Sequence, residues 1–111
     1  AVTTGNNNTI VGKLAGDAIT TGGANVAIGE DALSAATTAD NNTAVGQGAL
    51  EANTSGTKNV AVGTGAGAAV TTGASSTLIG YAAGDSITTG NYNTAVGDRS
   101  AQATTTGAEN G

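Results

Sequence analysis

The sequence predicts an all-β chain folded as a β-solenoid, in which a short repeated unit winds into stacked, parallel coils. Three observations predict this fold. A glycine recurs every 17 residues without insertion or deletion, the composition favours small and β-branched residues, and the charged residues fall at only a few positions of the repeat. The recurring glycines are Gly12, Gly29, Gly46, Gly63, Gly80 and Gly97.

We number the 17 positions of the repeat as columns, with the recurring glycine in column 5. The consensus is N-[TV]-A-[VI]-G-x-x-A-[GL]-x-A-x-T-T-G-x-x. Six full copies cover residues 8–109 and partial copies cover residues 1–7 and 110–111, so residues 1–111 form a single repeat domain. Column 1 holds Asn8, Asn25, Asn42, Asn59, Ser76 and Asn93. Column 4 holds Val11, Ile28, Val45, Val62, Ile79 and Val96.

Each coil is expected to contain two short strands separated by tight turns. A unit of 17 residues is too short for a helical hairpin, and its Gly and Thr content opposes a helix. The first strand ends at column 4, where Val or Ile is expected to point into the coil, and the following glycine turns the chain. The second strand is expected near columns 8–13, and Thr-Thr-Gly closes the coil. Identical residues of successive coils, the column 1 asparagines among them, then stack as ladders about 4.8 Å apart.

Columns 9 and 12 exchange volume between copies. Where column 9 is Gly, as in Gly16 or Gly67, column 12 is the larger Ile19 or Val70. Where column 9 is Leu50, column 12 is Asn53. We expect these two columns to share one cavity in the core of each coil.

Column 3 is predicted to face away from the coil, because successive side chains of a strand point to opposite sides. It carries no charged residue, which suggests that another copy of the chain covers it; the alternative is that Ala is simply tolerated on an exposed surface. The sparse core of a single chain also favours association. The predicted inter-chain face is Ile10, Ala27, Ala44, Ala61, Leu78 and Ala95.

Composition excludes several classes of function. The three basic residues cannot neutralise much nucleic-acid phosphate, and no apolar run reaches the roughly 20 residues that span a membrane. The chain has no His and no Cys, and its charges are scattered over turn columns. We therefore expect no enzyme, no catalytic or metal-binding residues and no cofactor. Asp98 and Arg99, near Asp85, are interpreted as solvated surface residues, and the acidic turns lack a calcium-binding repeat motif.

The repeat resembles that of two groups of fibrous proteins. The phrase N-x-A-[VI]-G-x-x-A is similar to the head repeats of trimeric autotransporter adhesins, and "NNTAVGQGALEANTSGTKN" is similar to repeats of phage tail fibres and related surface fibres. The resemblance covers the whole chain and centres on Asn42, Ala44, Val45, Gly46 and Ala49 with their equivalents. It implies a left-handed, homotrimeric β-roll located outside the cell, on a cell surface or on a virion.

These observations lead to a structural function. We expect a fibre segment that gives rigidity and surface attachment, with a host receptor or glycan as a further partner. Both ends of the chain stop within a repeat, which suggests end-to-end continuation into a longer fibre. The only aromatic residues, Tyr81 and Tyr92, are expected on the surface.

The alternative is a monomeric solenoid that binds ice or another ligand through its Thr ladders. In columns 13 and 14 the two Thr are adjacent, whereas an ice-binding face needs residues two apart, so that both side chains point the same way.

Overall fold

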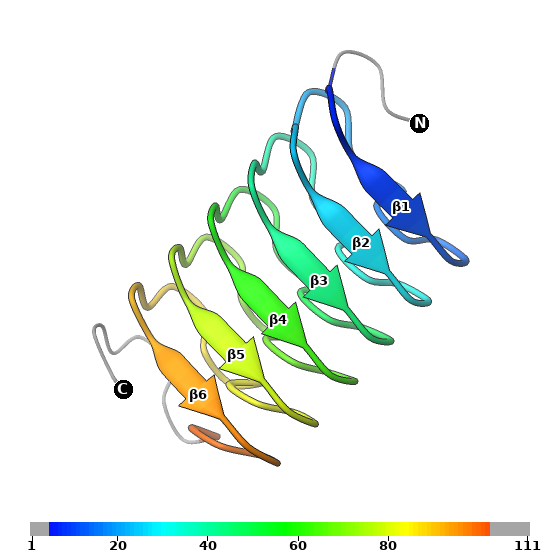
Figure 1. Cartoon of the computed structure of the whole chain (residues 1–111). Coiled ribbons are helices and arrows are strands. Elements are labelled where there is room, and N and C mark those ends of the chain that lie inside the picture. Colours follow the sequence, from blue (N-terminus) through cyan, green and yellow to red (C-terminus); the bar gives the residue numbers. More distant parts are fainter. Residues whose placement is uncertain (1–4, 103–111) are drawn as a thin grey trace.

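The computed structural model, which describes residues 5–102, is a β-solenoid with one strand in each coil. Figure 1 shows the six strands side by side in one row, with the connecting turns behind them. Five complete coils occupy residues 8–92, and residues 93–102 begin a sixth. The strands are β1 (Thr9–Val11), β2 (Val26–Ile28), β3 (Thr43–Val45), β4 (Val60–Val62), β5 (Thr77–Ile79) and β6 (Thr94–Val96).

The strands form one parallel sheet in the order β1-β2-β3-β4-β5-β6. Each residue pairs with the residue 17 positions later, as Ala27 pairs with Ala44 and Ala44 with Ala61. Hydrogen bonds between coils continue outside the sheet, for example from the Thr37 amide to the Thr54 carbonyl oxygen at 3.3 Å. The invariant repeat length therefore keeps every column in register along the solenoid.

The prediction of a second strand near columns 8–13 is wrong, because the described residues form no strand there. The residues of columns 7 and 9 adopt a left-handed backbone conformation in every described copy, with φ of 59° at Asp31 and 54° at Leu33. A strand needs negative φ throughout, so the chain makes successive tight turns instead. In the first coil these turns are closed by amide-to-carbonyl bonds from Ala15 to Gly12, from Asp17 to Leu14 and from Ile19 to Gly16.

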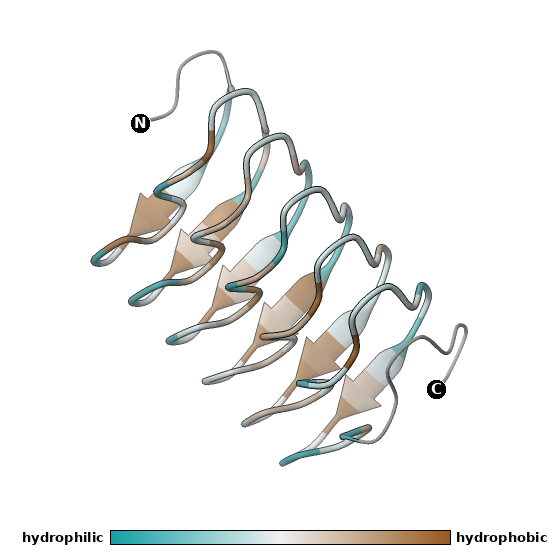
Figure 2. Ribbon diagram, turned by 180° about the vertical axis from the view of Figure 1, so that it is seen from behind, coloured by the Kyte–Doolittle hydropathy of each residue, from teal (hydrophilic) through white to brown (hydrophobic). Residues whose placement is uncertain are grey.

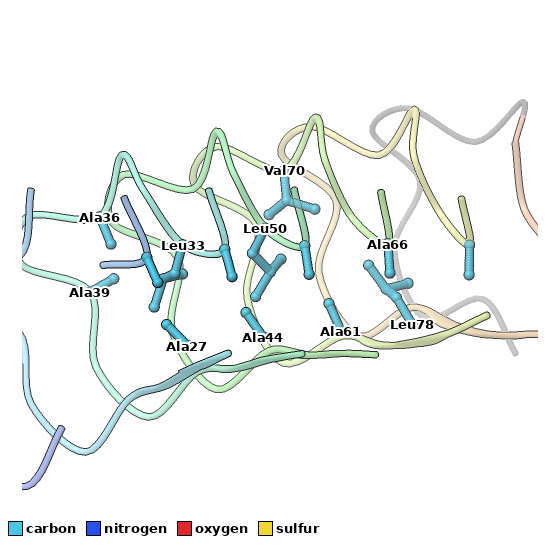
Figure 3. Close-up of a cluster of buried hydrophobic side chains, with 14 of the residues drawn as sticks. Ala27, Leu33, Ala36, Ala39, Ala44, Leu50, Ala61, Ala66, Val70 and Leu78 are labelled. Atoms are coloured by element: carbon cyan, nitrogen blue, oxygen red, sulfur yellow. The ribbon is translucent and has the colours of Figure 1, made fainter. Parts of the chain in front are cut away.

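The core runs through the middle of the solenoid as a single stack of side chains. In Figure 3, Ala27, Ala44 and Ala61 point from the strands toward Leu33 and Leu50, which come from the turns on the opposite side. Both leucines are fully buried. Column 8 adds a second buried row of small residues, which is Ala15, Ala32, Ala49, Ala66 and Ala83.

The structure confirms that columns 9 and 12 share one cavity. Ile19, Leu33, Leu50, Val70 and Ile87, the large residues of the two columns, are at most 1% exposed. A Cβ atom added to Gly67 would lie 2.9 Å from side-chain carbons of both Leu50 and Leu78 and 3.5 Å from Val70. Column 3 takes part in this packing, because Leu78 is the column 3 residue of β5.

Sequence predictions for residues 1–4 and 103–111, including the second half of the sixth copy, lie outside the described residues.

Candidate interaction surface

The two sides of each strand are reversed relative to the sequence prediction. Column 3 points into the coil: Ala27, Ala44, Ala61 and Leu78 are fully buried and Ala95 is 3% exposed, while Ile10 packs partly buried against the same core. These residues cannot form the predicted inter-chain face, because their own coil already covers them. The prediction that column 4 fills the coil is wrong for the same reason.

Columns 2 and 4 instead form the outward surface of the sheet, which we call the outer sheet face. Four of its column 4 side chains are exposed, Val11 at 57%, Ile28 at 37%, Ile79 at 38% and Val96 at 65%, and the two central ones are half-buried. Figure 2 shows hydrophobic colouring toward the arrowhead end of the strands, while the turns carry both polar and hydrophobic stretches. The face consists of Thr9, Val11, Val26, Ile28, Thr43, Val45, Val60, Val62, Thr77, Ile79, Thr94 and Val96, none of which is charged.

Buried column 1 side chains, which are Asn in every case but one, hold the starts of β2 to β6 in place. The Asn42 side-chain oxygen accepts the Asn59 amide at 3.0 Å, and its side-chain nitrogen donates to the Gly56 carbonyl oxygen at 2.8 Å. One side chain thus joins its own coil to the next. Ser76 continues the ladder, because its hydroxyl oxygen accepts the Asn93 amide at 3.2 Å.

The column 5 glycines let the coils stack closely where each strand ends. Gly46 has φ of 131°, and an added Cβ atom would lie 2.6 Å from the carbonyl carbon of Gly63 in the next coil. A side chain is therefore excluded both by the backbone conformation and by the neighbouring coil. The Asn ladder and the Gly stack together keep the outer sheet face regular from coil to coil.

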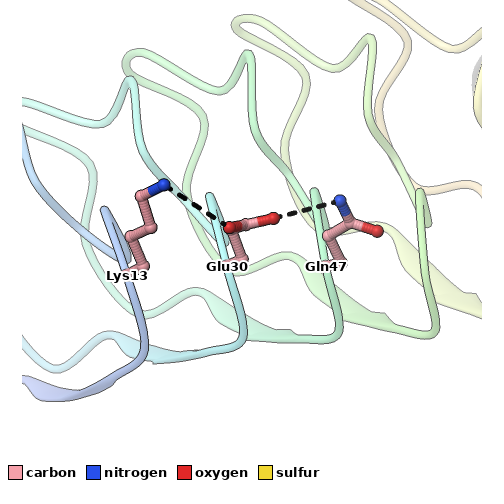
Figure 4. A network of polar contacts seen from close by, with 3 residues as sticks. All are labelled: Lys13, Glu30 and Gln47. Atoms are coloured by element: carbon pink, nitrogen blue, oxygen red, sulfur yellow. Dashed lines mark hydrogen bonds and ion pairs between the residues drawn. The ribbon is translucent and has the colours of Figure 1, made fainter.

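We call the side where the strands end, columns 5–7, the exit edge. Figure 4 shows its polar row, in which Lys13, Glu30 and Gln47 follow one another along column 6. The Lys13 ammonium lies 4.0 Å from a Glu30 carboxylate oxygen, and the Gln47 side-chain nitrogen donates to the other Glu30 oxygen at 3.3 Å. Both charged side chains are solvent-exposed, so the pair contributes little to stability. Farther along, the Arg99 guanidinium lies 5.4 Å from the centre of the Tyr81 ring.

We call the opposite side, columns 16 and 17, the entry edge. Carboxylate and amide side chains here accept backbone amides of the preceding coil. The Asp40 carboxylate accepts the Gly23 amide at 2.7 Å, and the Asn91 side-chain oxygen accepts the Ala74 amide at 2.8 Å. Tyr92 lies on this edge and is 60% exposed.

The Thr columns lie away from the outer sheet face. In column 13 the hydroxyls of Thr20, Thr54 and Thr71 donate to the carbonyl oxygen of the Thr one coil later, at 3.3–3.4 Å. Column 14 is exposed in every described coil. The column 13 hydroxyls therefore bind the backbone, as expected for a structural role.

Among residues 5–102, no three or more acidic, His or Cys side chains gather where they could hold a metal ion. Within the same residues, no helix is long and apolar enough to cross a membrane. Asp98 and Arg99 were interpreted from the sequence as solvated surface residues. Both are exposed, and the Arg99 guanidinium lies over the Tyr81 ring. No family model matches the chain, and no curated protein or solved structure is similar enough to it to support an inference.

Proposed function

We propose that the chain is a rigid structural segment of a fibre in which copies associate through the outer sheet face. The observation that carries the proposal is this face itself, a continuous uncharged strip of exposed and half-buried Val, Ile and Thr. Exposed apolar strips of this kind mark surfaces where another molecule packs. Columns 2 and 4, in place of the buried column 3, then form the inter-chain face.

The construction of the solenoid supports a mechanical role. The described backbone is bonded from coil to coil at the strands, at the turns and through buried Asn side chains. The molecule is elongated, with extents of 36 × 21 × 16 Å. A rod in which every coil is bonded to the next resists bending, and its length grows with each added repeat.

The resemblance of the repeat to adhesin heads and phage tail fibres extends the proposal. It favours a homotrimer outside the cell, on a cell surface or on a virion, with a role in attachment and a receptor or glycan as further partner. No catalytic role is included, because the chain has no His or Cys and the carboxylates of residues 5–102 do not converge.

Solution mass by analytical ultracentrifugation tests the association. We expect the chain to be oligomeric at micromolar concentration and V45K/I79K to be monomeric, because each lysine would be buried without a partner in the interface. T72K is the matched control, since Thr72 is exposed in column 14, and it should stay oligomeric. Circular dichroism verifies that all three proteins are folded. A folded wild-type chain that remains monomeric at every concentration would refute the proposal.

Ice binding remains a second candidate function, and one observation favours it. Columns 2 and 4 are two residues apart, so their hydroxyl and methyl groups point the same way. They form a regular array, with spacings of about 4.8 Å between strands and about 6.6 Å along each strand. Only Thr9, Thr43, Thr77 and Thr94 supply hydroxyls to this array. Thermal hysteresis in the wild-type chain, abolished in T43K and unchanged in T72K, would support this function over the fibre role.

A further inference from the structure

The outer sheet face is too narrow to form a stable interface by itself. Each strand is three residues long and six strands are stacked, which gives a strip of about 10 by 29 Å, or roughly 290 Å². Stable protein interfaces bury about 800 Å² on each partner. If copies associate as proposed above, residues flanking the strip must supply the remaining contact area.

The two edges of the strip each carry one exposed aromatic residue. Tyr81 is on the exit edge, two residues after the end of β5, and is 52% exposed. Tyr92 is on the entry edge, two residues before the start of β6, and is 60% exposed. They are the only aromatic residues of the chain. Tyr is enriched in interfaces because it supplies a large contact area and a polar hydroxyl at low entropic cost.

Within one chain these two side chains are separated by the width of the sheet. Between parallel copies they approach each other. A symmetry axis along the solenoid keeps each coil at the same height and turns the exit edge of one copy toward the entry edge of the next. Because β5 and β6 are adjacent strands, Tyr81 and Tyr92 then differ in height by one strand spacing, about 4.8 Å. An antiparallel arrangement would instead bring like edges together.

We propose that Tyr81 of one copy packs against Tyr92 of its neighbour and that this contact fixes a parallel arrangement of the copies. The inference rests on the proposed association of the chain. Arg99 supports the contact, because its guanidinium lies over the Tyr81 ring, 5.4 Å from the ring centre, and this cation–π contact favours that ring position. The pair lies near one end of the described solenoid, so it also defines the register between copies.

Photo-oxidative cross-linking, which joins touching tyrosine rings, tests the contact. An equal mixture of ¹⁴N and ¹⁵N chains is cross-linked, and the linked peptides are identified by mass spectrometry. We expect a Tyr81–Tyr92 link containing both isotopes. Y81F and Y92F should each lose this link, while an equal mixture of the two variants should regain it. Both side chains are exposed, so Phe should leave the fold intact.

The outcomes separate the two proposals. An oligomer in which Y92F still forms Tyr81–Tyr81 links, or one without dityrosine, would overturn the Tyr contact and leave the proposed association standing. A chain that is monomeric in the ultracentrifuge would overturn the association and the Tyr contact together. A mixed-isotope Tyr81–Tyr92 link that disappears at the dissociating substitutions V45K/I79K would support both.

Discussion

At the residue scale, the repeat is governed by positions where the backbone of the coils needs particular side-chain groups or no side chain at all. Column 1 illustrates this for a side chain. Asn42 is buried and uses both its oxygen and its nitrogen, so a residue with only one of these groups leaves a buried backbone partner without its bond. The prediction of an Asn ladder needed only the recurrence of Asn, but the second bond, to column 15, could not be read from spacing.

Column 5 offers a prediction that separates backbone strain from steric overlap. Gly46 and Gly97 share a left-handed backbone, with φ of 131° and 128°. An added Cβ atom would lie 2.6 Å from Gly63 in the first case and would meet nothing within 4 Å in the second. We expect G97A to lower the free energy of unfolding by about 1–3 kcal/mol, the cost of the strained backbone. G46A should cost at least twice as much, because overlap with the next coil is added.

Urea denaturation followed by circular dichroism measures both variants. Hydrogen exchange at the β6 amides checks that the end coil, where Gly97 lies, is folded in each protein. Equal losses for the two substitutions would show that stacking overlap is unimportant at column 5.

At the scale of the element, the sequence predicted one strand of each coil and misassigned its faces. Columns 3 and 4 are both apolar, so an alternating pattern does not tell which of them is buried. The second strand was misassigned because Leu33 and Leu50 adopt left-handed conformations that Leu rarely takes. A signal was present: Gly16, Gly67 and Gly84 occupy the same column, as expected where positive φ is required.

The shared cavity of columns 9 and 12 leads to a second prediction. Coil four has Ala61, Gly67 and Val70 in columns 3, 9 and 12, whereas coil two has Ala, Leu and Ala there. G67L alone should destabilise the protein by about 1–3 kcal/mol through overpacking. Adding V70A reproduces the pattern of coil two and should recover part of this loss.

A double-mutant cycle in urea measures the coupling between the two positions, which we expect to be favourable by about 0.5–3 kcal/mol. Leu78 also approaches Gly67, so the recovery should be incomplete. The matched control combines G67L with A52S, a partly exposed column 11 site, and should show additive losses. Additivity in G67L/V70A as well would contradict a shared cavity.

At the scale of the whole molecule, the fold was predictable because stability comes from contacts between adjacent coils. Every strand pairs only with the strands of neighbouring coils. The composition of the outer sheet face was less predictable, because it depends on which of the alternating side chains of β1–β6 point outward. Its location therefore had to come from the burial of individual residues such as Ala44 and Val45.

The same coil-to-coil construction predicts that one whole repeat can be removed. Deletion of residues 44–60 joins Thr43 to Ala61 and preserves every column, and the Asn42 side chain comes to lie below Ser76. We expect cooperative thermal unfolding at a lower midpoint, because one interface between coils is lost.

The control is the deletion of residues 44–59, which is one residue shorter and leaves Val60 after Thr43. Side chains beyond the junction then change face within that strand. This variant should lose cooperative unfolding or aggregate. Similar melting curves for the two deletions would show that the 17-residue register does not control folding.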